Sequence, residues 1–146
     1  ILLVFFRPFI REHERQSIAG TSYLLVGVFI IVVFFPTDIV TLALLFLAVA
    51  DPLASLVGLR LGKDKIVGQK SLQGTMAAFF ACTILAAGFY YSKGLMTERI
   101  MIVSVLSGLI GAISELLPIG KLDDNFTFPV VSSSLLYLLL WLFGGL

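Results

Sequence analysis

The residues best suited to chemistry lie between Ala50 and Gly74, in the stretch ADPLASLVGLRLGKDKIVGQKSLQG. Asp51 falls inside an apolar run that predicts a helix, and a basic loop leads from there to Lys70 and Ser71 at the start of another apolar run. A carboxylate can bind a metal ion, and the free N–H groups at the start of a helix can bind an anion. We therefore predict that this stretch binds a metal-bound nucleoside triphosphate.

Asp51 is unusual because a carboxylate inside a membrane helix costs a few kcal/mol (about 3 kcal/mol on insertion scales) unless it is paired, hydrated or metal-bound. Spacings of four, three and four residues place Asp51, Ser55, Gly58 and Gly62 on one helical face. Small residues at these spacings are also typical of a helix-packing face. Packing explains the glycines but not the aspartate, so we predict a functional role for Asp51 and leave that of Ser55 open.

The loop from Leu59 to Lys70 carries four basic residues and two glycines. One interpretation is an anchor on anionic lipid headgroups. The other is a phosphate site, because Lys70 and Ser71 open a helix and the positive end of its dipole attracts anions. Gly74, one turn further on, would keep side-chain bulk away from whatever group approaches the helix start. The P-loop pattern G-x-x-x-x-G-K-[ST] is absent from the sequence, so no P-loop fold is predicted.

Two further acidic positions follow. Glu115 lies in an apolar run three residues before Pro118, where it can share a magnesium ion with Asp51 or form an ion pair with a loop lysine or arginine. The segment Asp123-Asp124-Asn125, with Thr127 and Pro129 after it, can cap a helix or contact a metal or a ribose. Both pairs of alternatives stay open.

The elements that must position these residues are membrane helices. The 146 residues are 59% hydrophobic and only 13% charged, about half the charge of a soluble domain. A bilayer core of about 30 Å needs about 20 apolar residues of helix. We predict an all-α, polytopic membrane protein of one domain (1–146) with five complete spans, after a truncated helix at an incomplete N-terminus. The spans are Ile18–Phe35, Ile39–Gly58, Leu72–Tyr91, Ile100–Leu117 and Phe126–Phe143.

The basic residues predict the orientation of these spans, because short cytoplasmic loops carry an excess of lysine and arginine. Alternating spans place eight basic residues on one side and only Lys93 and Arg99 on the other. The eight are Arg7, Arg11, Arg15, Arg60, Lys63, Lys65, Lys70 and Lys121. The acidic clusters fall on the same side, so we expect a site reached from the cytoplasm. One cysteine and one histidine exclude a disulfide framework and a Cys/His zinc site.

The order and spacing of these residues resemble the CTP-dependent lipid-alcohol kinases, which include dolichol kinase, phytol kinase and CTP-dependent diacylglycerol kinase. The resemblance runs from about Arg11 to the end of the chain. The matching residues are Asp51-x-x-Ala54-Ser55-x-x-Gly58-x-x-x-Gly62-Lys63, Lys70-Ser71-Leu72-x-Gly74, Glu115-Leu116-x-Pro118 and Asp123-Asp124-Asn125-x-Thr127-x-Pro129. In that family the first two segments and the Asp-Asn segment are associated with CTP and metal. Glu14 matches an acidic position before the first complete span.

Phosphatidate cytidylyltransferase belongs to the same broader superfamily. Its Ser-Pro-x-Lys-Thr-x-Glu-Gly pattern is represented here only by Lys70 to Gly74, and its Pro-Gly-His-Gly-Gly signature is absent from the sequence. The resemblance therefore favours the kinases. The chain departs from the kinase pattern as well: Ala50 and Pro52 flank Asp51 where glycine and a small residue are frequent, and Gln73 replaces a frequent glutamate, which puts a catalytic role at that position in doubt.

The resemblance implies transfer of the γ-phosphate of CTP to the hydroxyl of a polyprenol, phytol or diacylglycerol, at a bacterial inner membrane or the endoplasmic reticulum. Asp51 with Glu115 or Asp124 would hold Mg²⁺, and either Asp51 or Glu115 would be the general base. Phosphate-binding residues would be Lys70, Arg60 and Lys63, with Ser55, Ser71, Gly58, Gly62, Gly74, Asn125 and Thr127 contacting CTP. The alternatives are a cytidylyltransferase, or a transporter or non-catalytic subunit whose acids line an ion path. No nucleic-acid partner is expected, and a homodimer is left open.

Overall fold

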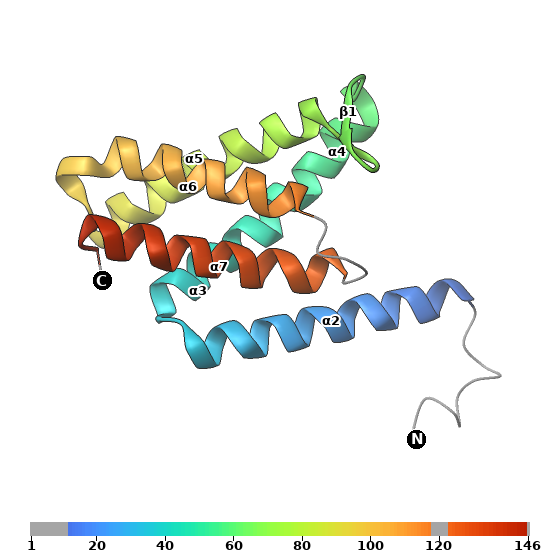
Figure 1. Cartoon of the computed structure of the whole chain (residues 1–146), viewed down its shortest axis with the longest axis horizontal. Coiled ribbons are helices and arrows are strands. Elements are labelled where there is room, and N and C mark those ends of the chain that lie inside the picture. The colour runs from blue at the N-terminus through green and yellow to red at the C-terminus, as the bar shows by residue number, and fades with distance from the viewer. Residues whose placement is uncertain (1–11, 118–122, 146) are drawn as a thin grey trace.

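The computed structural model describes residues 12–117 and 123–145, and the side chains of residues 20–117 and 123–145. The described chain is almost entirely helical (Figure 1). Its elements are α2 (Glu12–Phe34), α3 (Thr37–Leu45), the π-helix η1 (Phe46–Ala50), α4 (Asp51–Leu61), β1 (Lys65–Val67), β2 (Lys70–Ser71), α5 (Leu72–Lys93), the 3-10 helix η2 (Thr97–Arg99), α6 (Ile100–Leu116) and α7 (Asp124–Phe143). The predicted truncated helix at residues 1–6, Pro118 and Lys121 lie outside the described residues.

Long apolar helices form because lipid offers no hydrogen-bonding partner to the backbone, so each segment must satisfy its own N–H and C=O groups. Among the residues that the structure describes, four helical stretches are long and apolar enough to cross a membrane: Thr37–Leu61, Leu72–Lys93, Thr97–Leu116 and Asp124–Phe143. These four match four of the predicted spans to within a few residues. The remaining predicted span, Ile18–Phe35, falls in α2 (Glu12–Phe34), whose part with described side chains, Gly20–Phe34, is apolar.

The stretch Thr37–Leu61 is one continuous helical span of three parts, with the wide π turn η1 directly before Asp51. The sequence predicted a plain helix here, so η1 is a correction. Its physical cause is Pro52, which has no N–H to donate and whose ring clashes with the carbonyl oxygen four residues earlier. A wide turn relieves that clash directly before Asp51, which is half-buried.

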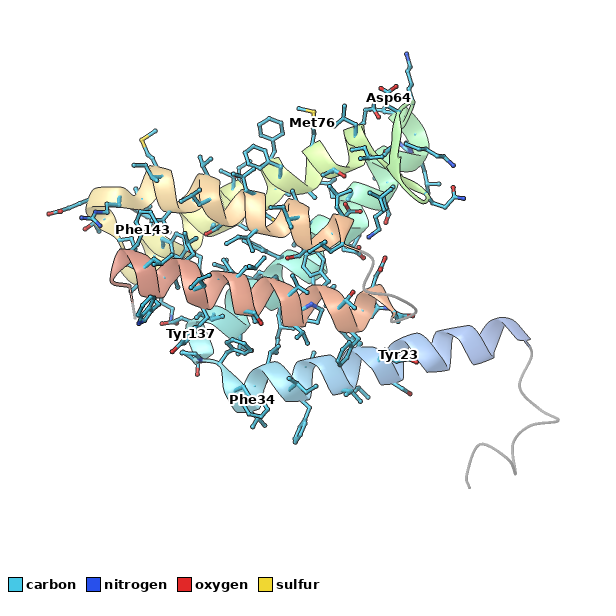
Figure 2. The ribbon with its side chains drawn as sticks, in the orientation of Figure 1. Tyr23, Phe34, Asp64, Met76, Tyr137 and Phe143 are labelled. Atoms are coloured by element: carbon cyan, nitrogen blue, oxygen red, sulfur yellow. The ribbon has the colours of Figure 1, made fainter. Side chains whose placement is uncertain are left out.

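The helices pack in a layered bundle in which α5 lies against α4 and α6, while α7 lies between α6 and α2 (Figure 1). Large side chains such as Phe46, Tyr90 and Phe128 fill the interior. The outer side of α2 is apolar and exposed, with Phe34 at 73% (Figure 2), as expected of a surface that faces lipid. Helix α5 ends at Lys93 and is capped by Gly94, whose positive φ of 64° suits glycine at a helix C-terminus.

The two ends of the bundle differ in chemistry. At one end, the Lys93 ammonium pairs with Asp38 Oδ1 at 3.0 Å, which joins α5 to the start of α3. At the other end lie the β hairpin, the C-terminal turn of α6 and the N-terminal turn of α7 (Figure 1). The candidate site is built at this second end.

Candidate functional site

A short antiparallel hairpin covers the ends of α4 and α5. Its strands pair Lys65 with Ser71 and Val67 with Lys70, and Gly68 turns the chain between them at a φ of 56°. The sequence predicted a basic loop with two glycines at these residues and no strands, so the hairpin is a second correction. A glycine accepts this positive φ without strain, which is why the turn forms here. The hairpin brings Lys65 and Lys70 over the end of the helix that carries Asp51.

Beneath the hairpin lies a cavity of about 580 Å³. Side chains and backbone from α4, the hairpin, α5, α6 and α7 line it. The lining residues are Asp51, Ala54, Ser55, Gly58, Leu59, Gly62, Lys65, Gln69, Lys70, Ser71, Gly74, Glu115 and Asp124. The structure thus brings together nine of the predicted site residues from four separate segments of the sequence: Asp51, Ser55, Gly58, Gly62, Lys70, Ser71, Gly74, Glu115 and Asp124.

Lys70 joins the acidic residues of this cavity. Its ammonium nitrogen lies 3.0 Å from Asp124 Oδ2 and 3.5 Å from Glu115 Oε1, and it also donates to the backbone carbonyl of Glu115. The last carbonyls of α6 are the negative end of its dipole, which favours a cation at this place. Lys70 therefore connects the hairpin to α6 and α7. The pair between Lys70 and Glu115 agrees with one of the two interpretations of Glu115 that the sequence left open, an ion pair with a loop lysine.

Glu115 is the most buried acid of the cavity, with 7% of its surface exposed. Besides Lys70, it accepts a hydrogen bond from the Thr75 hydroxyl, whose Oγ1 lies 3.3 Å from Glu115 Oε2. The same Oγ1 lies 3.1 Å from the carbonyl oxygen of Ser71, so the one hydroxyl hydrogen is shared between the two acceptors. A carboxylate with so little water needs such partners, since a buried charge without them is costly. The carboxylate of Glu115 is accordingly held in one position by α5 and β2.

The start of α5 differs from the open anion site that we predicted. Ser71 is its N-cap, and the Ser71 Oγ accepts from the Gly74 N–H at 3.2 Å. The Leu72 N–H donates to the carbonyl of Asp64 at 2.9 Å. Two of the N–H groups expected to face a ligand are therefore already used within the protein. This outcome follows from the hairpin, which folds Asp64 back onto the helix start.

The small residues of α4 and α5 allow a close contact between the two helices. A Cβ atom on Gly74 would lie 2.6 Å from the carbonyl oxygen of Ala54, and one on Gly58 would lie 3.0 Å from Ser71 Oγ. The group that approaches Gly74 is the backbone of α4, and Gly74 also lines the cavity, so its predicted contact with CTP stays a prediction. The packing interpretation of Ala54, Gly58 and Gly62 holds together with their position on the cavity wall.

The residues at the start of α7 have different roles. Asp123 caps the helix, since its Oδ1 accepts from the Asn125 N–H at 2.9 Å, while Asp124 reaches the cavity. Asn125 lies beside α2, where a Cβ on Gly20 would be 3.3 Å from its Nδ2. Thr127 is buried, with 2% exposed. Asn125 and Thr127 do not line the cavity.

Arg60 and Lys63, predicted to neutralise phosphates, are exposed and also stand outside the cavity lining. Glu14 falls in the first turns of α2, among the residues whose side chains lie outside the described part of the structure. The roles of these residues stay predictions. Conversely, Lys65 and Gln69 line the cavity although the sequence did not predict them as site residues, because their position depends on the hairpin. The glycine at position 68 was the signal for such a turn.

The charges of the cavity fit a divalent cation that arrives with a nucleotide. Its lining holds three carboxylates and two ammonium groups, so several phosphate charges would be repelled unless a cation accompanied them. Among the side chains that the structure describes, no three histidine, cysteine, aspartate or glutamate residues form a metal site by themselves. Magnesium commonly needs only one or two carboxylates, because the substrate phosphates complete its ligands.

Three curated proteins to which the chain is similar are named CTP-dependent diacylglycerol kinase 1. The one from Schizosaccharomyces pombe is 34% identical over 143 residues, which cover 91% of this chain and 66% of the relative. The one from Eremothecium gossypii is 32% identical, over 84% of this chain and 45% of the relative. The one from Saccharomyces cerevisiae is 28% identical, over 84% and 49%. The chain thus spans between about half and two thirds of their lengths. No family model and no solved structure matches it significantly.

Proposed function

Because this chain belongs to the family of CTP-dependent lipid kinases, we propose that it transfers the γ-phosphate of CTP to the hydroxyl of diacylglycerol. The observation that carries the proposal is the cavity at one end of the bundle, where carboxylates and lysines meet beside membrane helices. The relatives' names support the nucleotide and the lipid. Polyprenols and phytol, which the sequence also suggested, are tested as competing acceptors.

In the proposed reaction the lipid hydroxyl oxygen bonds to the γ-phosphorus of CTP. The bond from that phosphorus to the β–γ bridging oxygen breaks, and CDP leaves. Asp51 or Glu115 takes the proton of the hydroxyl. Phosphoryl transfer depends mainly on positioning and on neutralising charge, so Lys70 and Lys65, which line the cavity, hold phosphate oxygens.

We propose Mg²⁺ as the accompanying cation, held by Asp51 with Glu115 or Asp124. When bound, it would neutralise charge on the phosphates. In the described structure the Lys70 ammonium pairs with two of these carboxylates. Nucleotide binding is therefore expected to draw Lys70 from Asp124, since the phosphates offer that ammonium a stronger charge partner.

We expect the site at the cytoplasmic face of its membrane. The hairpin end carries Arg60, Lys63, Lys65 and Lys70, whereas the opposite end carries Lys93 and Arg99. An excess of basic residues in short loops marks the cytoplasmic side. CTP would then enter from the cytoplasm, while the lipid reaches the cavity from the bilayer between helices.

The experiment that tests this function gives the purified protein magnesium and CTP that carries different labels on its α- and γ-phosphates. Diacylglycerol, phytol, a polyprenol and phosphatidate are supplied separately. We expect the γ-label on diacylglycerol. The α-label on phosphatidate would identify a cytidylyltransferase instead, and no label on any lipid together with no binding of CTP would return the chain to the transporter or subunit class.

A further inference from the structure

One side chain of α5 holds the turn that connects α4 to the hairpin. The Oε1 atom of Gln73 accepts from the backbone N–H of Lys63 at 3.2 Å, and its Nε2 atom donates to Oδ2 of Asp64 at 3.1 Å. Figure 2 shows Asp64 at the hairpin end of the bundle. The backbone carbonyl of Asp64 also accepts from the N–H of Leu72, at 2.9 Å. Residues 63–64 are thereby tied to the first turn of α5.

Backbone hydrogen bonds also fix this turn, since the Gly62 N–H donates to the carbonyl of Gly58 at 3.1 Å and Lys65 pairs with Ser71 in the hairpin. Gly62 leaves the helix in an extended conformation, with a φ of −67° and a ψ of 107°. Its opposite side packs on Ser71, since a Cβ at Gly62 would lie 2.7 Å from Ser71 Oγ. Gly62 lines the cavity. The position of this part of the cavity wall therefore depends on a steric contact with Ser71, on the backbone hydrogen bonds of Gly62 and Asp64, and on the side-chain hydrogen bonds of Gln73.

The chemistry of Gln73 matches its two partners. The N–H of Lys63 requires an acceptor, and the carboxylate of Asp64 requires a donor. A primary amide supplies one of each, whereas a carboxylate supplies acceptors only. A glutamate at position 73 would accept from Lys63 but would face the negative charge of Asp64.

We propose that Gln73 is a positioning residue for nucleotide binding, which fixes the Gly62–Lys63 turn against the phosphates through its amide bridge to Lys63 and Asp64. The inference rests on the proposed CTP-dependent activity. It assigns no contact with the reacting atoms to Gln73. Its action is through the turn, so binding of CTP responds more than the rate of the chemical step.

The test changes which side chain of the bridge between residues 73 and 64 donates the hydrogen bond and which accepts it. Gln73→Glu places two carboxylates side by side, and the KM for CTP should rise about tenfold, with kcat changed by less than about twofold. Asp64→Asn alone should keep a KM close to the unmodified protein, because its amide oxygen still accepts from Gln73. The double variant Gln73→Glu/Asp64→Asn should restore the KM, since the carboxylate introduced at position 73 would then accept from both Lys63 and the new amide.

Hydrogen exchange supplies a measurement that does not depend on activity. In the protein without nucleotide, the peptide covering residues 59–68 should exchange faster in Gln73→Glu and return to its original protection in the double variant. An unchanged KM for CTP in Gln73→Glu would overturn the inference. So would a double variant whose KM for CTP stays as high as that of Gln73→Glu. If the unmodified protein transfers no γ-phosphate, the proposed function fails separately, and the exchange data still decide whether the bridge holds the turn.

Discussion

Asp51 offers the most direct test of the cavity at the scale of single residues. It is half-buried at the start of α4 and lines the cavity. Asp51→Asn keeps the shape of the side chain but removes its charge, so we expect γ-phosphate transfer to fall by about 100-fold or more. The measurement is transfer of label to lipid in detergent, together with the melting temperature.

A matched control lies on the same span. Asp38 pairs with Lys93 at the opposite end of the bundle, and Asp38→Asn should leave the transfer rate within about twofold, because a surface ion pair contributes little. Full activity in Asp51→Asn, with a normal melting temperature, would remove Asp51 from the mechanism.

Lys70 combines a structural contact with a proposed role in catalysis, and paired substitutions separate the two. Lys70→Met leaves the buried carboxylate of Glu115 without its cation, so the free energy of unfolding should fall by about 1–3 kcal/mol. Adding Glu115→Gln removes the unpaired charge and should restore most of the stability. Neither variant should transfer phosphate, and thermal unfolding in detergent measures the stability.

The opposite pattern would assign Lys70 to structure alone. If Lys70→Met/Glu115→Gln recovered transfer along with its melting temperature, neither the ammonium nor the carboxylate would be needed for chemistry. Lys70→Arg is a further comparison, since it keeps the charge while changing the geometry of the donor groups.

Sequence reasoning identified some of these residues and missed others for a physical reason. Asp51 and Glu115 were predicted because a carboxylate inside an apolar run requires an explanation. Gln73 and Thr75 gave no such signal. Their partners, Asp64 and Glu115, are 9 and 40 positions away in the chain, and only the fold brings them together.

At the scale of elements, the contact between α4 and α5 determines the wall of the cavity. Gly74→Ala would place a methyl group against the carbonyl of Ala54, at 2.6 Å, so the helices must separate and the melting temperature should fall by several degrees. Gly88→Ala is the control on the same helix. A Cβ there meets nothing within 4 Å, so the melting temperature should stay or rise.

Equal melting temperatures for the two alanine variants would show that the approach of α4 to α5 does not limit stability. Transfer activity adds a second comparison. Gly74 lies on the cavity wall and Gly88 does not, so activity should fall only in Gly74→Ala.

The helices were predictable from the sequence where the apolar runs were long, whereas the π turn and the hairpin were not. Continuous apolar runs and the break at Pro36 indicated the spans to within a few residues of the helices observed. The π turn η1 escaped prediction because its five residues, Phe46–Ala50, are uniformly apolar and fit a regular helix equally well. The hairpin escaped because its strands are three and two residues long, too short for alternation to appear.

At the scale of the whole molecule, all the proposed chemistry lies at one end of the bundle, so the function depends on which side of the membrane that end faces. We expect the hairpin in the cytoplasm, where CTP is available, because the basic residues gather there. Single cysteines can report this. Ile66→Cys marks the hairpin and Ser92→Cys marks the opposite end, and both positions are exposed.

The native Cys82 gives a low background, since it is buried against α6. In sealed cells a maleimide that cannot cross the membrane should label Ser92→Cys and leave Ile66→Cys unlabelled until the membrane is opened. The reverse pattern would place the cavity on the side away from cytoplasmic nucleotides. The carboxylates and lysines would then lack access to CTP, and the proposed kinase could not operate in the cell even if purified protein transferred phosphate.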